Sequence, residues 1–272
     1  MSLDEFLDQE YDLSIRSKPG DTSYYRETVL YRHLNDRGLP LWRELYQGDL
    51  RRVVDSVDAE GAAHETITWK NVIRRFGNDE DPLGPAEPLT WADGYEYQFC
   101  VETPQPEWSI EGWPNDLIGW GVHCLVIDAH YEYDFLRSTE HGAIGKLRRI
   151  GDVVAPPDDE RPFPIHFGPF IEVPAFTKRN LRTRFTGLTR KNGEACGILA
   201  FDMDASPFHM FMQGNRVDLT PRFSGTLTVR LDDGALEHGQ FVEWVMTEGK
   251  MISPVYEISR IEKSDYESGS IE

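Results

Sequence analysis

The chain has 272 residues, of which 39% are hydrophobic and 12% aromatic, and its formal net charge is -19. Nucleic-acid binding depends on Lys and Arg side chains that neutralise phosphates, so a chain this acidic is not expected to bind DNA or RNA. Anionic membrane surfaces are disfavoured for the same reason. No segment reaches the roughly 18 uncharged apolar residues that a membrane-spanning helix needs, so membrane insertion is not expected either.

Cysteine usage and the N-terminus limit the cellular setting. Cys100, Cys124 and Cys196 are far apart and form no CxxC pair, which argues against a zinc cluster or a disulfide framework. Residues 1–12 are acidic and lack the basic and apolar regions of a secretory signal peptide. We therefore expect a cytoplasmic protein without a metal or another cofactor.

The first part of the chain, residues 11–102, predicts an antiparallel meander. Polar and apolar residues alternate in short segments that are separated by Gly, Asp and Pro, a pattern typical of strands and tight turns. The expected strands are 25–32, 41–46, 51–57, 64–75 and 95–102. Turns are expected at 19–21, 36–38, 47–49 and 59–61, and an exposed loop at 77–93.

The segment 115–137 is apolar around most of its circumference, yet it carries Asp116, His123, Asp128, His130, Glu132 and Asp134. Dense apolar spacing after Pro114 predicts a helix, although two glycines and several β-branched residues leave a strand as the alternative. A second, short helix is expected at 143–150, and a proline-rich loop at 152–164.

Strand patterns return after residue 167. Lys191-Asn192-Gly193 and Asp232-Asp233-Gly234 stand between alternating segments, and such Asn-Gly and Asp-Gly sequences are strong hairpin signals. The expected strands are 168–176, 181–190, 194–203, 207–218, 223–231, 236–246 and 253–263, followed by a frayed tail.

These elements predict a mainly β (α+β) protein of one domain, 1–272, with β meanders at 11–102 and 167–263 around a helical insert at 115–150. A sheet of so many strands must curl or close, and an apolar helix needs cover on all sides. The expected architecture is a large curved antiparallel sheet or open barrel, with the central helix against its concave face. In outline this is the architecture of proteins that shuttle lipids or lipoproteins, although no family motif is matched.

His130 and Asp134 are the candidate catalytic pair. Their spacing puts them on one face of the segment whether it is a helix or a strand. A carboxylate beside an imidazole fixes its tautomer and raises its basicity, which suits a general base. With His123 the pair offers ligands for a divalent ion, but HExxH and other metalloenzyme motifs are absent, so the alternative of a structural polar seam is preferred.

Two further groups are candidate ligand-binding residues. His209, Met210 and Met212 lie in an apolar strand, and methionine is suited to an adaptable pocket. Trp108 and Trp113 flank an irregular connection and are placed to rim a pocket. Core packing and loop anchoring are the respective alternatives.

The sequence lacks the Gly-x-Ser-x-Gly, GxGxxG and GxxxxGK[ST] motifs. The leading hypothesis is therefore a non-catalytic binding or carrier-like module for a hydrophobic small molecule or a protein segment, with Trp108, Trp113, His123, His130, His209, Met210 and Met212 as its ligand-binding residues. The alternatives are an enzyme that uses His130 and Asp134, and a structural subunit of an assembly.

Overall fold

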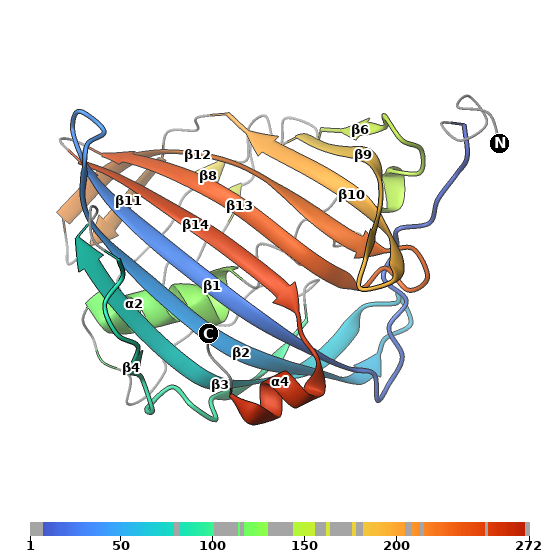
Figure 1. The fold of residues 1–272 in the computed structure, drawn as a ribbon. Coiled ribbons are helices and arrows are strands. Elements are labelled where there is room, and N and C mark those ends of the chain that lie inside the picture. The colour runs from blue at the N-terminus through green and yellow to red at the C-terminus, as the bar shows by residue number, and fades with distance from the viewer. Residues whose placement is uncertain are drawn as a thin grey trace.

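A computed structural model describes residues 8–78, 82–100, 114, 117–129, 144–155, 162–163, 176–177, 182–204, 208–212, 215–247 and 250–269. These residues form a mainly β protein built on one large antiparallel sheet, which confirms the predicted class (Figure 1). Along the sheet the strand order is β4-β3-β2-β1-β14-β13-β12-β10-β9-β6, with β5 paired to β3 and β11 paired to β12.

The strands in chain order are β1 (Thr22–Asn35), β2 (Pro40–Val57), β3 (Ala63–Asn78), β4 (Glu87–Pro88), β5 (Glu96–Phe99), β6 (Val153–Val154), β7 (Pro162–Phe163), β8 (Phe176–Thr177), β9 (Arg182–Lys191), β10 (Glu194–Met203), β11 (Phe208–Met212), β12 (Asn215–Arg230), β13 (Leu236–Thr247) and β14 (Lys250–Arg260). The helices are α2 (Leu117–His123), the π-helix η1 (Cys124–Ala129), the 3-10 helix η2 (Ile144–Lys146) and α4 (Lys263–Ser268). The strands β7 and β8 pair with each other, apart from the large sheet.

The two predicted meanders are one sheet, because the first strand pairs with the last. Tyr25 lies opposite Arg260 and Asn35 lies opposite Lys250, so β1 and β14 are joined over eleven residue pairs. The hairpins predicted at Asn192-Gly193 and Asp232-Asp233-Gly234 are confirmed between β9 and β10 and between β12 and β13. Asn192 and Gly193 both have positive φ, 53° and 84°, as a tight hairpin turn requires.

The turn predicted at 47–49 is wrong. Residues 41–46 and 51–57 belong to the single strand β2, and its pairing with β3 shifts register between Gln47 and Asp49, as at a β-bulge. A Cβ on Gly48 would lie 2.9 Å from the ring of Trp69. Glycine therefore serves here for close packing inside a strand rather than for a chain reversal.

The two faces of the sheet differ in polarity. Side chains alternate between faces along each strand, and the face that contacts α2, called the inner face below, carries a row of buried apolar residues. Its members include Tyr25, Val29, Tyr46, Leu50, Ile67, Trp69, Leu199, Phe201, Leu227, Phe241, Tyr256 and Ile258. The opposite outer face carries polar pairs such as Arg26 with Asp49, 2.8 Å apart, and Thr66 with Asp55, 2.6 Å apart.

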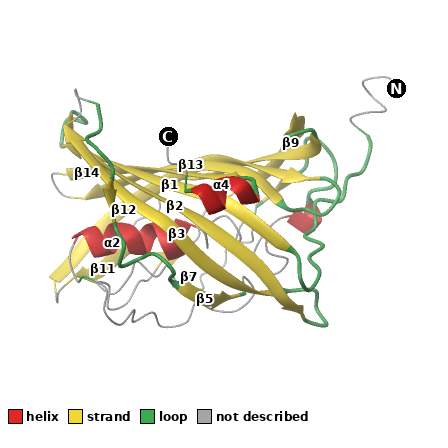
Figure 2. Cartoon of the chain, turned by 60° about the horizontal axis from the view of Figure 1, so that its bottom comes forward, coloured by secondary structure: helices red, strands yellow, loops and turns green. Residues whose placement is uncertain are grey.

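The long central helix predicted over 115–137 is wrong. Within the described residues 117–129, α2 has seven residues and passes into the six-residue π-helix η1. Gly119 and Gly121 and the β-branched residues that follow have low helix propensity, and this agrees with a short, irregular helix. The segment does lie on the inner side of the sheet (Figure 2), where Tyr97 donates a 2.7 Å hydrogen bond to the carbonyl of Val126.

The sheet is open and does not close into a barrel, so of the two predicted alternatives the structure has the large antiparallel sheet. Its strand order ends at β4 on one side and at β6 on the other, and the described residues do not pair these two strands. The expected frayed tail is corrected as well, since residues 263–268 form α4. Tyr266 of this helix is buried against Tyr24, with ring centroids 5.1 Å apart.

Candidate functional site

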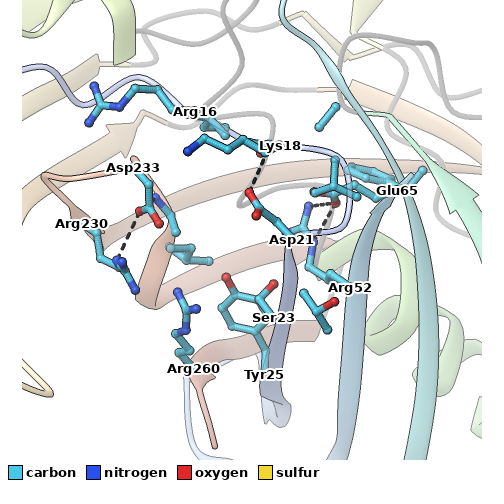
Figure 3. Close-up of a pocket in the computed structure, with 18 of the residues that line it drawn as sticks. Arg16, Lys18, Asp21, Ser23, Tyr25, Arg52, Glu65, Arg230, Asp233 and Arg260 are labelled. Atoms are coloured by element: carbon cyan, nitrogen blue, oxygen red, sulfur yellow. Dashed lines mark hydrogen bonds and ion pairs between the residues drawn. The ribbon is translucent and has the colours of Figure 1, made fainter. Parts of the chain in front are cut away.

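A pocket of about 450 Å³ lies at the end of the sheet where β1 and β3 begin and β2 and β14 end (Figure 3). Its walls also include the segment 15–18 and the turn between β12 and β13. Apolar wall is supplied by Ile15, Tyr25, Val54, Phe99 and Leu236. The pocket therefore lies where the inner face of the sheet meets two loops.

The segment before β1 is fixed to the β12–β13 turn through Arg16. Its guanidinium donates from Nη2 to the carbonyl of Leu231 at 2.8 Å and from Nε to the carbonyl of Asp232 at 3.1 Å. Gly234 in this turn has a φ of 71°, and a Cβ on it would lie 2.2 Å from the carbonyl oxygen of Ser14. The two loops thus form a continuous wall that a side chain at 234 would force apart.

Arg52 and Glu65 form a buried ion pair in the pocket wall. Both residues occupy inner-face positions, on β2 and β3, and they are only 8% and 7% exposed. Arg52 Nε donates to Glu65 Oε2 at 2.8 Å, and Nη2 donates to the same oxygen. The guanidinium also lies 5.8 Å from the ring centre of Phe99. Charge-assisted bonds of this kind offset the cost of burying the two ions.

A second group of charges surrounds the β12–β13 turn. Arg230 donates to both carboxylate oxygens of Asp232, at 3.0 and 2.7 Å. These bonds, with a smaller desolvation effect against them, lower the pKa of Asp232 to about 2. Arg230 also lies 3.2 Å from Asp233, and the buried Glu237 is 3.6 Å from Arg260. Burial raises the pKa of Glu237, while Arg260 acts in the opposite direction.

The pocket gathers basic residues in a strongly acidic protein. Five of its lining residues are basic and four are acidic, compared with 28 and 47 in the whole chain. The basic residues are Arg16, Lys18, Arg52, Arg230 and Arg260, and the acidic ones are Asp21, Glu65, Asp232 and Asp233. Such a pocket suits a small molecule that has both an apolar part and a polar group.

A serine–histidine pair lies elsewhere, on the outer face. His238 Nδ1 is 2.9 Å from Ser259 Oγ, and Glu257 Oε1 is 4.0 Å from the same nitrogen. In a catalytic triad the carboxylate binds the imidazole nitrogen that the serine does not use. This arrangement therefore lacks the geometry that would orient the ring as a base for the serine.

Among the residues that the structure describes, we find neither an activated cysteine nor a group of metal-binding side chains. Burial raises the pKa of the Cys196 thiol, which disfavours the nucleophilic thiolate. Within the described ranges no three His, Cys, Asp or Glu side chains are grouped as a metal site. In these same ranges no helix is long and apolar enough to cross a membrane.

The site residues predicted from the sequence are not tested by the structure. Trp108, Trp113, His130 and Asp134 lie outside the described residues. His123 belongs to α2, and His209, Met210 and Met212 belong to β11, but their side chains are not described. All of these assignments stay predictions.

The pocket was missed by the sequence interpretation, although a signal for it exists. Arg52 lies two residues from both Leu50 and Val54, so it shares their face of the strand. Glu65 lies two and four residues before Ile67 and Trp69 and shares their face in the same way. A charged residue in register with apolar neighbours on a strand faces the core, and it needs a partner of opposite charge there. That pattern predicts a buried pair between two strands, but it does not predict the loops that complete a pocket.

No protein-family model matches the chain, and no curated protein matches it. Among solved structures, one described as lipid–protein interactions in lipovitellin is similar with a TM-score of 0.46 and 8% identity, over 90% of this chain and 25% of that chain. This chain thus spans about a quarter of the lipovitellin chain. A putative lipoprotein from Parabacteroides distasonis has a TM-score of 0.22 and 8% identity, over 92% of this chain and 98% of its own. A DUF1329 family protein from Desulfovibrio piger has a TM-score of 0.18 and 7% identity, over 90% of each chain. Similarities this low assign no function to the protein.

Proposed function

We propose that this protein is a non-catalytic binding module for a small hydrophobic molecule, which it holds in the pocket at the end of the inner face. The observation that carries the proposal is the pocket itself: about 450 Å³ of space bounded by inner-face residues and by two interlocked loops. Binding sites for small molecules commonly have volumes of about 300–1,000 Å³ and combine apolar walls with a few polar groups.

The apolar wall supports contact with a hydrophobic ligand. Tyr25 is 3% exposed and Val54 is 6% exposed, and both point to the inner face, as do the core residues beyond them. Phe99 and Leu236 add apolar surface from β5 and β13. Removing about 100 Å² of apolar ligand surface from water would contribute about 2.5 kcal/mol of binding free energy before the entropic costs of association.

The walls of the pocket support a binding role because contacts within the protein itself join them. Arg16 ties the segment 15–18 to the β12–β13 turn, and the pair Arg52–Glu65 ties β2 to β3. A preformed site loses little conformational entropy when it binds.

The proposal is tested with N-phenyl-1-naphthylamine, an uncharged probe whose fluorescence rises in apolar surroundings. We expect saturable binding to the wild type, and loss of that binding in Ala63→Phe, because Ala63 lines the pocket. Ala200→Phe is the matched control, since Ala200 is half-buried on β10 and lies opposite Arg184 and Thr226, away from the pocket. Equal binding by both variants, or no saturable binding by the wild type, would refute the proposal.

A further inference from the structure

Three hydrogen-bond donors converge on the pocket from separate elements. Arg260 ends β14, Tyr25 lies in β1, and Lys18 belongs to the segment before β1. Tyr25 and Arg260 are directly opposite in the β1–β14 pairing, so their side chains leave the same face of the sheet as neighbours. Figure 3 shows the guanidinium of Arg260 beside Tyr25 at the floor of the pocket.

Arg260 has donor capacity that the described protein groups do not use. Its Nη1 is buried and has no hydrogen-bond partner, and the carboxylate of Glu237 stands 3.6 Å away as an ion-pair contact only. A guanidinium carries five N–H donors, and a buried donor without an acceptor costs free energy. The side chain as a whole is 26% exposed and lines the pocket, so an acceptor in the pocket would meet its remaining N–H donors.

The other two donors are a hydroxyl on the sheet and an ammonium at the exposed rim of the pocket. Among the described groups, neither the Tyr25 hydroxyl nor the Lys18 ammonium has a hydrogen-bond or ion-pair partner. Tyr25 as a whole is only 3% exposed, whereas Lys18 is exposed to solvent. Ammonium, hydroxyl and guanidinium groups together match an acceptor with several oxygens.

The pocket carboxylates are engaged by protein donors instead. Asp21 accepts a 2.7 Å bond from the backbone N–H of Lys18, and Asp233 accepts one of 2.9 Å from the backbone N–H of Ala235. Asp232 accepts two from Arg230. These bonds hold the acidic groups against the walls, whereas Arg260 has only the ion-pair contact with Glu237.

We infer that the pocket binds an oxyanion, a carboxylate or a phosphate group, between Arg260, Tyr25 and Lys18. Arginine binds such groups through two parallel N–H donors, and bonds of this kind are roughly twice as strong as neutral ones. The inference rests on the proposed function and deepens it: the ligand is an amphiphilic anion whose apolar part lies against Phe99 and Leu236. A carboxylate amphiphile and a free phosphate ion share the anionic chemistry, and the experiment separates them.

The test is isothermal titration of the full chain with octanoate, octanol and inorganic phosphate. We expect octanoate to bind at least about tenfold more tightly than octanol, the effect of one charge-assisted hydrogen bond. Equal binding of octanoate and octanol would overturn the oxyanion site and leave the proposed function intact. Binding of phosphate without octanol would support the oxyanion site and refute a hydrophobic ligand. No binding of any probe would refute both.

Variants assign the effect to the three donors. Arg260→Gln should weaken octanoate binding about tenfold or more and leave octanol binding unchanged. Tyr25→Phe and Lys18→Gln should weaken octanoate less, and they keep the test valid if loss of the Glu237 contact prevents Arg260→Gln from folding. Arg32→Gln is the charge-matched control, because Arg32 is exposed on the outer face of β1. Unchanged octanoate affinity in all three pocket variants, or an equal loss in Arg32→Gln, would overturn the inference.

Discussion

Two arginine–glutamate ion pairs join β2 to β3, one at each end of the inner face. Arg52 with Glu65 lies at the pocket end, and Arg74 with Glu44 lies at the opposite end. Each pair is a diagonal cross-strand pair, since Arg52 is opposite Ile67 and Tyr46 is opposite Arg74. Long side chains reach such diagonal partners.

The surroundings of the pairs differ. Glu44 accepts from Arg74 and also from the Tyr46 hydroxyl, at 3.1 Å, and Arg74 lies 3.7 Å from Glu87 as well. Burial raises the pKa of Tyr46, and the nearby Glu44 raises it further, so the tyrosine stays a donor. Arg52 and Glu65, in contrast, both line the pocket.

The comparison shows that the same two residue types give a closed polar network in one place and a pocket wall in another. What differs is the neighbours: the Tyr46 hydroxyl and Glu87 add polar contacts to the first pair, while the second pair borders the pocket. The two residue types alone therefore do not decide whether such a pair borders a pocket.

The largest effect is expected from Arg74→Met, which breaks the closed pair. It leaves the buried carboxylate of Glu44 without its cation, at a typical cost of about 3–5 kcal/mol in the free energy of unfolding. Urea unfolding followed by tryptophan fluorescence measures this loss. The double variant Arg74→Met/Glu44→Leu removes both charges and should recover most of it. Wild-type stability in the single variant would show that the network is not closed.

A smaller loss is expected from Arg52→Met, which breaks the pair at the pocket. Glu65 faces a space of about 450 Å³, which is large enough for water to hydrate the orphaned carboxylate. The cost should be about 1–3 kcal/mol, as for a buried polar group that loses one partner. The same urea measurement applies, with Arg74→Met as the reference. An equal loss in the two variants would break the comparison between the ends.

The class of the fold could be predicted from the sequence because it depends on local alternation and turn residues. Val29 and Tyr31 alternate with polar neighbours in β1, and Asn192-Gly193 has the backbone freedom that its turn requires. The choice between an open sheet and a barrel could not be made from the sequence, since closure depends on whether the two edge strands meet in space. Polar and apolar residues alternate along the strands in the same way in an open sheet and in a barrel.

The pocket could be predicted only in part. The positions of Arg52 and Glu65 within their strands indicate a charged pair on the inner face, but the convergence of Arg260 with Tyr25 requires the pairing of β1 with β14. These strands are more than 200 residues apart in the sequence. Alternation gives the face of a side chain and says nothing about its partner strand.

A third prediction concerns Gly121, which the sequence suggested only as a weakness in the helix. A Cβ at this position would lie 2.3 Å from the ring of Tyr46, the tyrosine of the closed network. Gly121→Ala should therefore push α2 away from the sheet and cost about 1–3 kcal/mol, as overpacking does. Gly145→Ala is the control, because a Cβ there meets no atom within 4 Å. Urea unfolding in which both variants resemble the wild type would argue against this packing of α2.

The smallest effect concerns pH and the histidine beside the pocket-end carboxylate Glu237. Burial lowers the pKa of His238 from 6.5, and Lys191 lowers it further, while Glu257 acts in the opposite direction. The unfolded chain therefore takes up a proton on this histidine at a higher pH than the folded protein does. The stabilisation is fully present above pH 6.5 and declines as the pH falls below that value towards the folded pKa.

Thermal unfolding at intervals from about pH 7.5 to about pH 5 measures this effect, a range that spans the ordinary histidine pKa. His238→Gln should lose stability less steeply over that range than the wild type. The lowered pKa values of Asp12, Asp152 and Asp232 act in a separate window, because these carboxylates have an ordinary pKa of 3.8 and take up protons only at lower pH. Burial raises the pKa of Glu237, so this residue makes the folded protein relatively more stable as the pH falls. The effect is the same in the wild type and in His238→Gln, so it cancels in the difference between their stabilities. Parallel pH profiles would show that the His238 imidazole is as well hydrated in the folded protein as in the unfolded chain.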